Sequence, residues 1–161
     1  MNIPPLLDRF AAAVAAADTQ GFAALFTPDG CYHDGFFGLH QGRAQIADML
    51  ARFHVGGEHF AWQFLEPLFT ESAGYARYLF SYRSREPESA GRLIVFDGMA
   101  RFRLHGGLIA DYAEVFDRGV AFTQLGYAGA RVLKLLGRYA GELNDSDAVR
   151  AHLAWRDARA R

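Results

Sequence analysis

Four long stretches rich in apolar residues occupy the middle of the chain and constrain its fold most strongly. They cover residues 58–69, 75–85, 92–104 and 108–117 and are rich in Phe, Tyr, Val, Ile and Leu. Gly, Ser, Pro and Glu interrupt them, which is typical of strands separated by turns. The sequence HGG at 105–107 predicts a hairpin turn, because two glycines adopt positive φ freely. The middle of the chain therefore predicts a mainly antiparallel sheet.

Helical patterns lie on both sides of these strands. Pro4 suits the start of a helix, and helical spacing continues through Leu6, Leu7, Phe10 and Val14. Thr19 is expected to cap a short second helix with Phe22, Leu25 and Phe26 on its inner side. Residues 43–54 predict a third helix, and helical periodicity returns at 129–139 and after Asn144. This order predicts an α+β fold, a single domain of residues 1–161 with helices on one face of the sheet.

A short polar segment between the early helices and the strands holds the first candidate site. Residues 27–30, Thr-Pro-Asp-Gly, predict a turn, and a short strand is expected from Cys31 to Asp34. In a regular strand Tyr32 and Asp34 share one face and His33 points to the other. Asp34 then has two interpretations. It is either a turn residue facing water, or a carboxylate among apolar rings whose pKa is raised toward that of a general base.

Composition excludes several classes of protein. The net charge of −1 gives no basic surface for nucleic acid. A single cysteine, Cys31, rules out an intramolecular disulfide and suits a reducing cytosol. No signal-peptide pattern and no long uninterrupted apolar run are present, so we expect a cytoplasmic protein that does not enter membranes. The histidines show no metal-ligand spacing, and we expect neither a metal nor a cofactor.

Two segments resemble the SnoaL-like polyketide cyclase group of the nuclear transport factor 2-like, or cystatin-like cone, superfamily. They are ALFTPDGCYHDGFFGLHQGRAQI at 24–46 and GGLIADYAEVFDRGVAFTQLG at 106–126. The resemblance covers about residues 5–126 and leaves 127–161 as a C-terminal helical extension. It implies a curved sheet that wraps around the N-terminal helices and leaves a deep apolar cavity.

The same resemblance implies which residues carry chemistry. Asp34 matches the proton-abstracting Asp of ketosteroid isomerase, which shares this fold. The two oxyanion donors of that enzyme fall on Phe10 and near Met99, so steroid isomerisation in that form is not expected. Asp117 stands where SnoaL-like cyclases keep an acidic residue. Limonene epoxide hydrolase also has an Asp there, but residues 78–84 contain no Asp to complete its catalytic triad.

Several further residues are candidates for the same site. Tyr32 can donate its hydroxyl to a substrate oxygen, although a packed core tyrosine is an equally ordinary role. Asp97 can supply an acid, unless it pairs with Arg101 on the same face of its strand. Asp117 can instead be an ordinary solvent-exposed turn residue with no role in the site. The candidate ligand-contacting residues are Phe10, Val14, Phe26, His33, Trp62 and Met99, and core packing accounts for the apolar ones as well.

Two hypotheses of function remain. The first is a lyase, isomerase or cyclase that acts on an apolar oxygenated ring compound through a carboxylate base. The alternative is a non-catalytic module that binds a small ligand or another protein. In either case we expect a homodimer formed through the sheet, because both faces of the strand at 92–104 carry apolar residues and helices cover only one. On this prediction Phe96→Glu or Phe102→Glu separates the subunits.

Overall fold

The computed structural model describes residues 4–159, and its centre is a six-stranded sheet in the order β2-β1-β6-β5-β4-β3. The strands are β1 (Phe26–Asp34), β2 (Gly38–Gln41), β3 (Gly57–Phe69), β4 (Ala73–Ser84), β5 (Leu93–His105) and β6 (Leu108–Phe116). Neighbouring strands are antiparallel, except that β1 and β6 run parallel. The predicted α+β fold with a mainly antiparallel sheet is confirmed.

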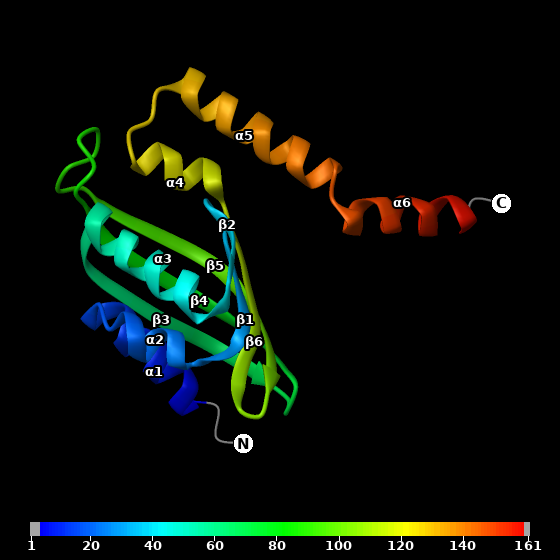
Figure 1. The fold of residues 1–161 in the computed structure, drawn as a ribbon. Coiled ribbons are helices and arrows are strands. Elements are labelled where there is room, and N and C mark those ends of the chain that lie inside the picture. The colour runs from blue at the N-terminus through cyan, green and yellow to red at the C-terminus, as the bar shows by residue number, and fades with distance from the viewer. Residues whose placement is uncertain (1–3, 160–161) are drawn as a thin grey trace. The chain divides into compact units, whose positions relative to one another are not determined.

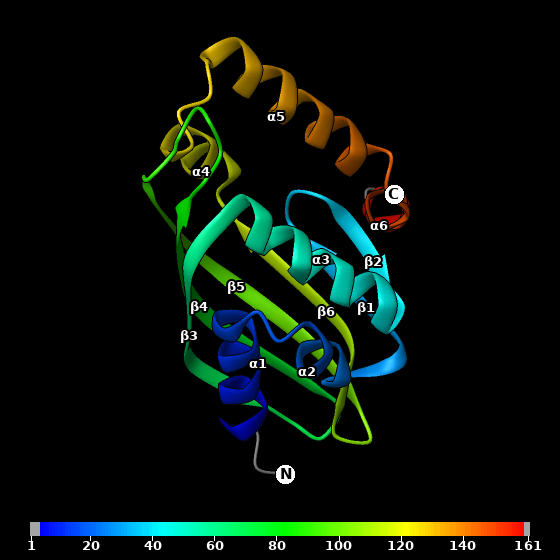
Figure 2. The same ribbon diagram turned by 60° about the vertical axis from the view of Figure 1, so that its left-hand side comes forward.

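Three helices cover one face of this curved sheet, as Figures 1 and 2 show. They are α1 (Pro4–Ala16), α2 (Thr19–Ala24) and α3 (Gly42–Gly56). Phe10 of α1 is fully buried, and its ring lies 5.1 Å from Trp62 and 5.4 Å from Tyr112 between ring centroids. Burying such a ring contributes about 1.5–3 kcal/mol, so aromatic packing between helices and sheet holds this layer in place.

Residues of β5 alternate between the two faces of the sheet. The inner, helix-covered face takes Ile94, Phe96, Ala100 and Phe102, which are buried. The outer face takes Leu93, Val95 and Met99, which are exposed. This two-residue alternation is the one predicted from the sequence. It also shows that Phe96 and Phe102 are core residues, so the prediction that their substitution by glutamate would act at a dimer contact is wrong.

Strand β3, which forms one edge of the sheet, is irregular at two points. Its pairing with β4 shifts between Glu58 and Ala61 and again between Leu65 and Leu68. At these shifts His59 and Glu66 adopt positive φ angles of 54° and 50°. Bulges of this kind twist an edge strand and make it a poor template for pairing with another chain.

Local details differ from the sequence predictions in three places. The Thr-Pro-Asp-Gly segment lies inside β1 rather than in a separate turn, at the register shift between Phe26 and Cys31. Phe26 accordingly begins β1 instead of ending the second helix, and Asp18 rather than Thr19 caps α2. A short helix, α4 (Arg118–Gln124), follows β6 and was not predicted.

The described residues form two compact units that divide after Gly126. The second unit consists of α5 (Gly129–Asn144) and α6 (Asp147–Arg159), neither of which contains a fully buried residue.

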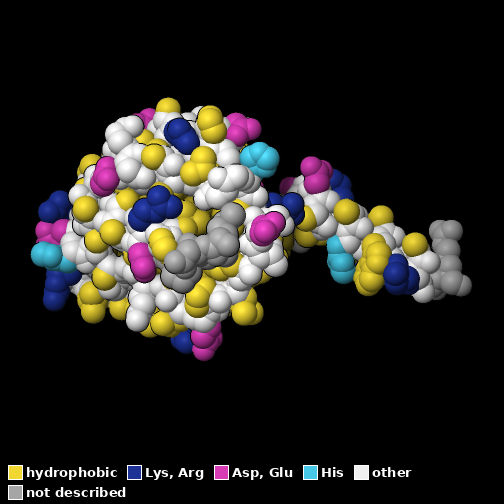
Figure 3. All heavy atoms as spheres, turned by 90° about the horizontal axis from the view of Figure 1, so that it is seen from below, with side chains coloured by type: hydrophobic (Ala, Val, Ile, Leu, Met, Phe, Trp, Pro, Cys, Tyr) yellow, Lys and Arg dark blue, Asp and Glu magenta, His cyan; other side chains and the backbone are white. Residues whose placement is uncertain are grey.

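Throughout residues 4–159 no helix combines the length and apolarity needed to cross a membrane. On the face seen in Figure 3, charged side chains of both signs are interspersed with hydrophobic ones.

Candidate functional site

Asp34 lies at the end of β1 and is held by the turn that follows it. Its Oδ1 atom accepts hydrogen bonds from the backbone N–H groups of Phe36, at 2.7 Å, and Phe37, at 2.6 Å. The residue is only 8% exposed. Burial raises the pKa of its carboxyl group, and the two N–H donors oppose that rise because they stabilise the charged form.

A second carboxyl group, that of Glu114 in β6, is electrostatically coupled to Asp34. Its Oε2 accepts a hydrogen bond of 3.0 Å from the Tyr112 hydroxyl, and its Oε1 accepts one of 3.4 Å from the N–H of Gly35. The hydroxyl of Tyr78 also interacts with this carboxyl group and lowers its pKa. Burial first, and then the negative charge of Asp34, raise the pKa of Glu114 from 4.5 to about 8. Glu114 is therefore mainly protonated at neutral pH.

The parallel pairing of β1 and β6 explains why these two carboxyl groups meet. Tyr32 pairs with Tyr112, and His33 pairs with Ala113. Continuing this register by one residue brings Asp34 alongside Glu114, and alternation turns both toward the inner face. Glu114 was not predicted from the sequence as a site residue. Its signal was the alternation of Tyr112, Ala113 and Glu114, but only the pairing of two distant strands places that glutamate beside Asp34.

Three buried tyrosines surround the carboxyl pair. Tyr32, Tyr78 and Tyr112 are each at most 1% exposed. The rings of Tyr32 and Tyr112 lie 4.5 Å apart between centroids. Burial raises the pKa of all three hydroxyl groups, and the charge of Glu114 adds to the effect. They are therefore neutral hydrogen-bond donors throughout the physiological range. The predicted sharing of one face by Tyr32 and Asp34 agrees with the structure.

His40 and Trp62 bring two more buried polar atoms to the inner face. His40 pairs with Tyr32 across β2 and β1, and burial lowers the pKa of its imidazole although the charge of Asp34 acts in the opposite direction. Its Nε2 atom and the Nε1 atom of Trp62 have no hydrogen-bond partner among the described residues. Trp62 packs against Tyr78, with ring centroids 4.9 Å apart.

Of the remaining apolar candidates, Phe10, Val14 and Phe26 are buried on the inner side of the sheet. Phe26 packs against Tyr32, with ring centroids 6.1 Å apart, and Phe10 packs against Tyr112. These residues therefore form the apolar surroundings of the tyrosines and, through them, of the carboxyl pair.

Asp97 and Met99 are not part of this group, contrary to their prediction as site residues. Both lie on the outer face of β5, where Met99 is 47% exposed. Asp97 forms a two-point ion pair with Arg77, at 2.9 and 2.7 Å, instead of the suggested pair with Arg101. The reason is the register of β4 and β5, which places Arg77 opposite Met99 and diagonally beside Asp97.

Asp117 and His33 also lie away from the carboxyl pair. Asp117 is exposed and caps α4 by accepting a hydrogen bond of 3.0 Å from the N–H of Val120. His33 faces the opposite side of β1 from Asp34, as the strand alternation predicted. Its Nε2 atom lies 3.0 Å from Asp111, which also binds Arg101.

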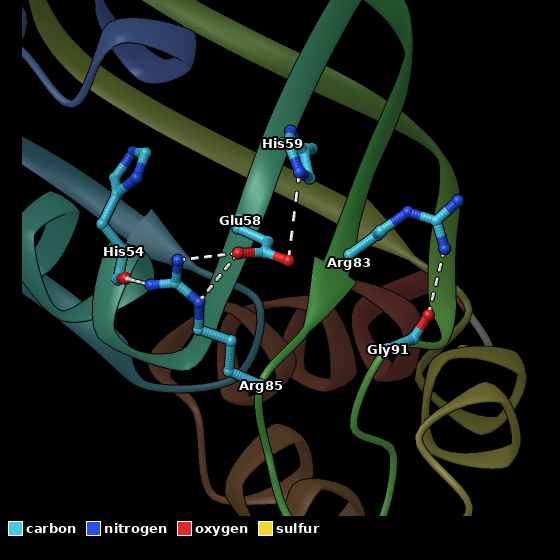
Figure 4. Close-up of polar contacts among 6 residues, drawn as sticks. All are labelled: His54, Glu58, His59, Arg83, Arg85 and Gly91. Atoms are coloured by element: carbon cyan, nitrogen blue, oxygen red, sulfur yellow. Dashed lines mark hydrogen bonds and ion pairs between the residues drawn. The ribbon is translucent and has the colours of Figure 1, made fainter.

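A separate polar cluster at the start of β3 has a structural role (Figure 4). Arg85 donates to Glu58 at 2.7 and 3.1 Å and to the carbonyl of His54 at 3.3 Å. His59 approaches the other oxygen of Glu58 at 3.9 Å, and Arg83 points away to the carbonyl of Gly91. Arg85 holds the pKa of Glu58 below its usual value. These contacts link the ends of α3, β3 and β4.

Within residues 4–159 no group of three or more His, Cys, Asp and Glu side chains could hold a metal ion.

Comparison with known proteins defines the class first. The fold matches a protein with a ketosteroid isomerase-like fold from Catenulispora acidiphila, at a TM-score of 0.70 and 19% identity over 78% of this chain and 95% of that one. It also matches an LEH-like epoxide hydrolase from M. tuberculosis, at a TM-score of 0.62 and 18% identity over 82% and 92% of the two chains. A candidate polyketide cyclase of Xanthomonas campestris gives a TM-score of 0.62 and 19% identity over 76% and 95%. The chain therefore has the nuclear transport factor 2-like cone fold.

A family model then identifies the chain more closely. The model for the SnoaL-like domain matches residues 7–112, and the chain belongs to this family. The resemblance noted in the sequence is thus confirmed. No curated protein sequence matches the chain.

Proposed function

We propose that this protein is an enzyme that moves a proton on an apolar, oxygenated ring compound, as a lyase, isomerase or cyclase. The observation that carries the proposal is the pair of Asp34, which is buried, and Glu114, which is partly buried, two carboxyl groups with different surroundings. Neighbouring acids whose environments separate their protonation states are suited to act as base and acid in one reaction. Asp34 ionises first, since two N–H groups stabilise its charge, and Glu114 keeps its proton at neutral pH.

The roles follow from these protonation states. Oδ2 of Asp34 accepts a proton from a carbon next to a carbonyl group, and the electrons of the broken C–H bond form the enolate double bond. Glu114 donates its proton to the carbonyl oxygen as negative charge develops there. The enol hydroxyl then returns its proton to Glu114, while Asp34 gives its proton either to carbon or to a leaving group as that group departs, so both carboxyl groups return to their first states. Glu114 thus takes the place that the sequence analysis gave to Tyr32, Asp97 or Asp117.

Similarity to other proteins supports this class of activity. A SnoaL-like family match and structural neighbours described as polyketide cyclase and epoxide hydrolase are consistent with small, apolar, oxygenated substrates. The apolar surroundings of the pair, built from Phe10, Trp62 and three tyrosines, suit a ring compound better than a charged metabolite.

Exchange of α-protons tests the proposal before the natural substrate is known. The probe is β-tetralone, an apolar cyclic ketone, in deuterium oxide, with loss of the α-proton signals followed by NMR. We expect the unmodified protein to accelerate exchange and Asp34→Asn to reduce that acceleration by roughly 10². Asp97→Asn, on the outer face, is the matched control and should exchange like the unmodified protein. Full activity in Asp34→Asn contradicts the assignment, and binding without exchange favours the non-catalytic module.

We also propose that two copies associate through the outer face of the sheet. Leu93, Val95 and Met99 of β5 and Val115 of β6 are exposed together on this face. Such a patch is a common feature of interfaces between proteins. Arg77 and Asp97 beside it pair with each other within one chain, so they bring no unpaired charge to this contact.

A further inference from the structure

Tyr78 reaches Glu114 across an intervening strand. Tyr78 belongs to β4, where it pairs with Gly98 of β5, and Glu114 belongs to β6, where it pairs with Ala100 of β5. The two residues are therefore separated by the width of β5. The Tyr78 hydroxyl nevertheless interacts with the Glu114 carboxyl group, and this interaction lowers the pKa of Glu114. Its side chain must pass over β5 to do so.

Gly98 lies directly beneath that side chain. A Cβ atom built on Gly98 would lie 2.5 Å from both Cζ and the hydroxyl oxygen of Tyr78, and 2.8 Å from Cε1. These distances are far inside van der Waals contact, so any side chain here would displace the tyrosine ring. The next residue on the same face of β5 is Ala100, which is also small and buried.

The conformation of Gly98 does not account for its presence. It is not among the glycines with positive φ. A glycine in the interior of a strand weakens the strand, and where no unusual backbone angle demands it, it marks the close approach of another group. The approaching group here is the ring of Tyr78.

We propose that Gly98 is a positioning residue for the reaction, because its lack of a side chain allows the Tyr78 hydroxyl to reach and hold the Glu114 carboxyl group. The catalytic consequence rests on the function proposed above, in which Glu114 is the acid. The placement of Tyr78 is a property of the free protein and can be measured without a substrate.

Titration of Glu114 in the unliganded protein tests the proposal. The carboxyl carbons of glutamate are labelled with ¹³C, and the signal of Glu114 is identified by its loss in Glu114→Gln. The interaction with Tyr78 favours the charged carboxylate, so removing the hydroxyl should raise the midpoint of the titration by roughly one pH unit. We expect this rise in Tyr78→Phe and in Gly98→Ala, and no further rise when the two are combined.

The matched control is Gly57→Ala in β3. A Cβ atom there would also meet a tyrosine ring, that of Tyr82, at 2.5 Å, but this ring does not bind Glu114. The variant should leave the Glu114 midpoint unchanged.

A Gly98→Ala midpoint equal to that of the unmodified protein would overturn the proposal, as would an unchanged midpoint in Tyr78→Phe. If Gly98→Ala does not fold, adding Tyr78→Leu should restore folding by removing the ring, and failure to do so also overturns it. None of these outcomes depends on exchange of β-tetralone.

Discussion

Substitution of Glu114 by glutamine removes a partly buried ionisable group and keeps nearly the same shape. Glu114 has a pKa of 4.5 when exposed to water and about 8 in the folded protein. Its proton is therefore bound more tightly in the folded state than in the unfolded one. The stability that follows from this preference is fully present below about pH 4.5 and is lost as the pH rises to 8.

The size of the effect follows from the two pKa values. A pKa difference of one corresponds to about 1.4 kcal/mol, so the loss between pH 4.5 and pH 8 approaches about 5 kcal/mol. Glu114→Gln has no proton to lose at this position. Any cost of the amide in place of the acid, such as its contact with the N–H of Gly35, is the same at every pH. Groups that do not interact with Glu114 cancel in the comparison.

Urea denaturation at pH 5, 6, 7, 8 and 9 measures this difference. We expect the free energy of unfolding of Glu114→Gln, relative to the unmodified protein, to increase by several kcal/mol from pH 5 to pH 9. Glu58→Gln is the control. Because Arg85 lowers the pKa of Glu58, both states are already ionised there above pH 5, and the difference should be flat. Parallel pH profiles for the unmodified protein and Glu114→Gln would show that Glu114 is not held protonated.

Two further predictions concern the two faces of the sheet and the turn after Asp34. Val95→Glu, on the exposed outer face, should give the mass of one chain in light scattering with an unchanged circular dichroism spectrum. The control Phe96→Glu buries a charge in the core and should unfold the chain, and a single-chain mass for the unmodified protein at micromolar concentration would refute the dimer. Gly35→Ala should lower the free energy of unfolding by about 1–3 kcal/mol, since a Cβ atom would meet the ring of Phe116 at 2.2 Å. Equal urea midpoints for Gly35→Ala and the unmodified protein would show that the turn adapts without cost.

The sequence was most informative where structure depends on neighbouring residues. Helical spacing located α1 through Leu6, Phe10 and Val14, and the apolar stretches located β3 to β6. Alternation along one strand correctly placed Tyr32 and Asp34 together and His33 opposite them. Each of these predictions needs only the period of a helix or a strand, which local side-chain patterns determine.

The sequence was less informative where the partner of a strand decides the outcome. Asp97 was a reasonable candidate, but the pairing of β4 with β5 supplies Arg77 as its partner on the outer face. The Thr-Pro-Asp-Gly segment has the composition of a turn, yet it forms part of β1, at the point where the pairing of β1 with β6 shifts register. In both cases pairing with residues distant in the sequence decided the structure, and the role or turn suggested by the local sequence did not form.

Glu114 shows most clearly what the tertiary structure alone decided. Nothing near it in the sequence distinguishes it from a solvated strand glutamate. Its raised pKa arises because the fold removes it from water and because the parallel pairing of β6 with β1 brings it near the charge of Asp34, while the Tyr78 hydroxyl opposes this rise. Local patterns determine that Glu114 lies in a strand, but burial and the charge of Asp34 are long-range effects, and only the assembled sheet brings them to bear on one carboxyl group.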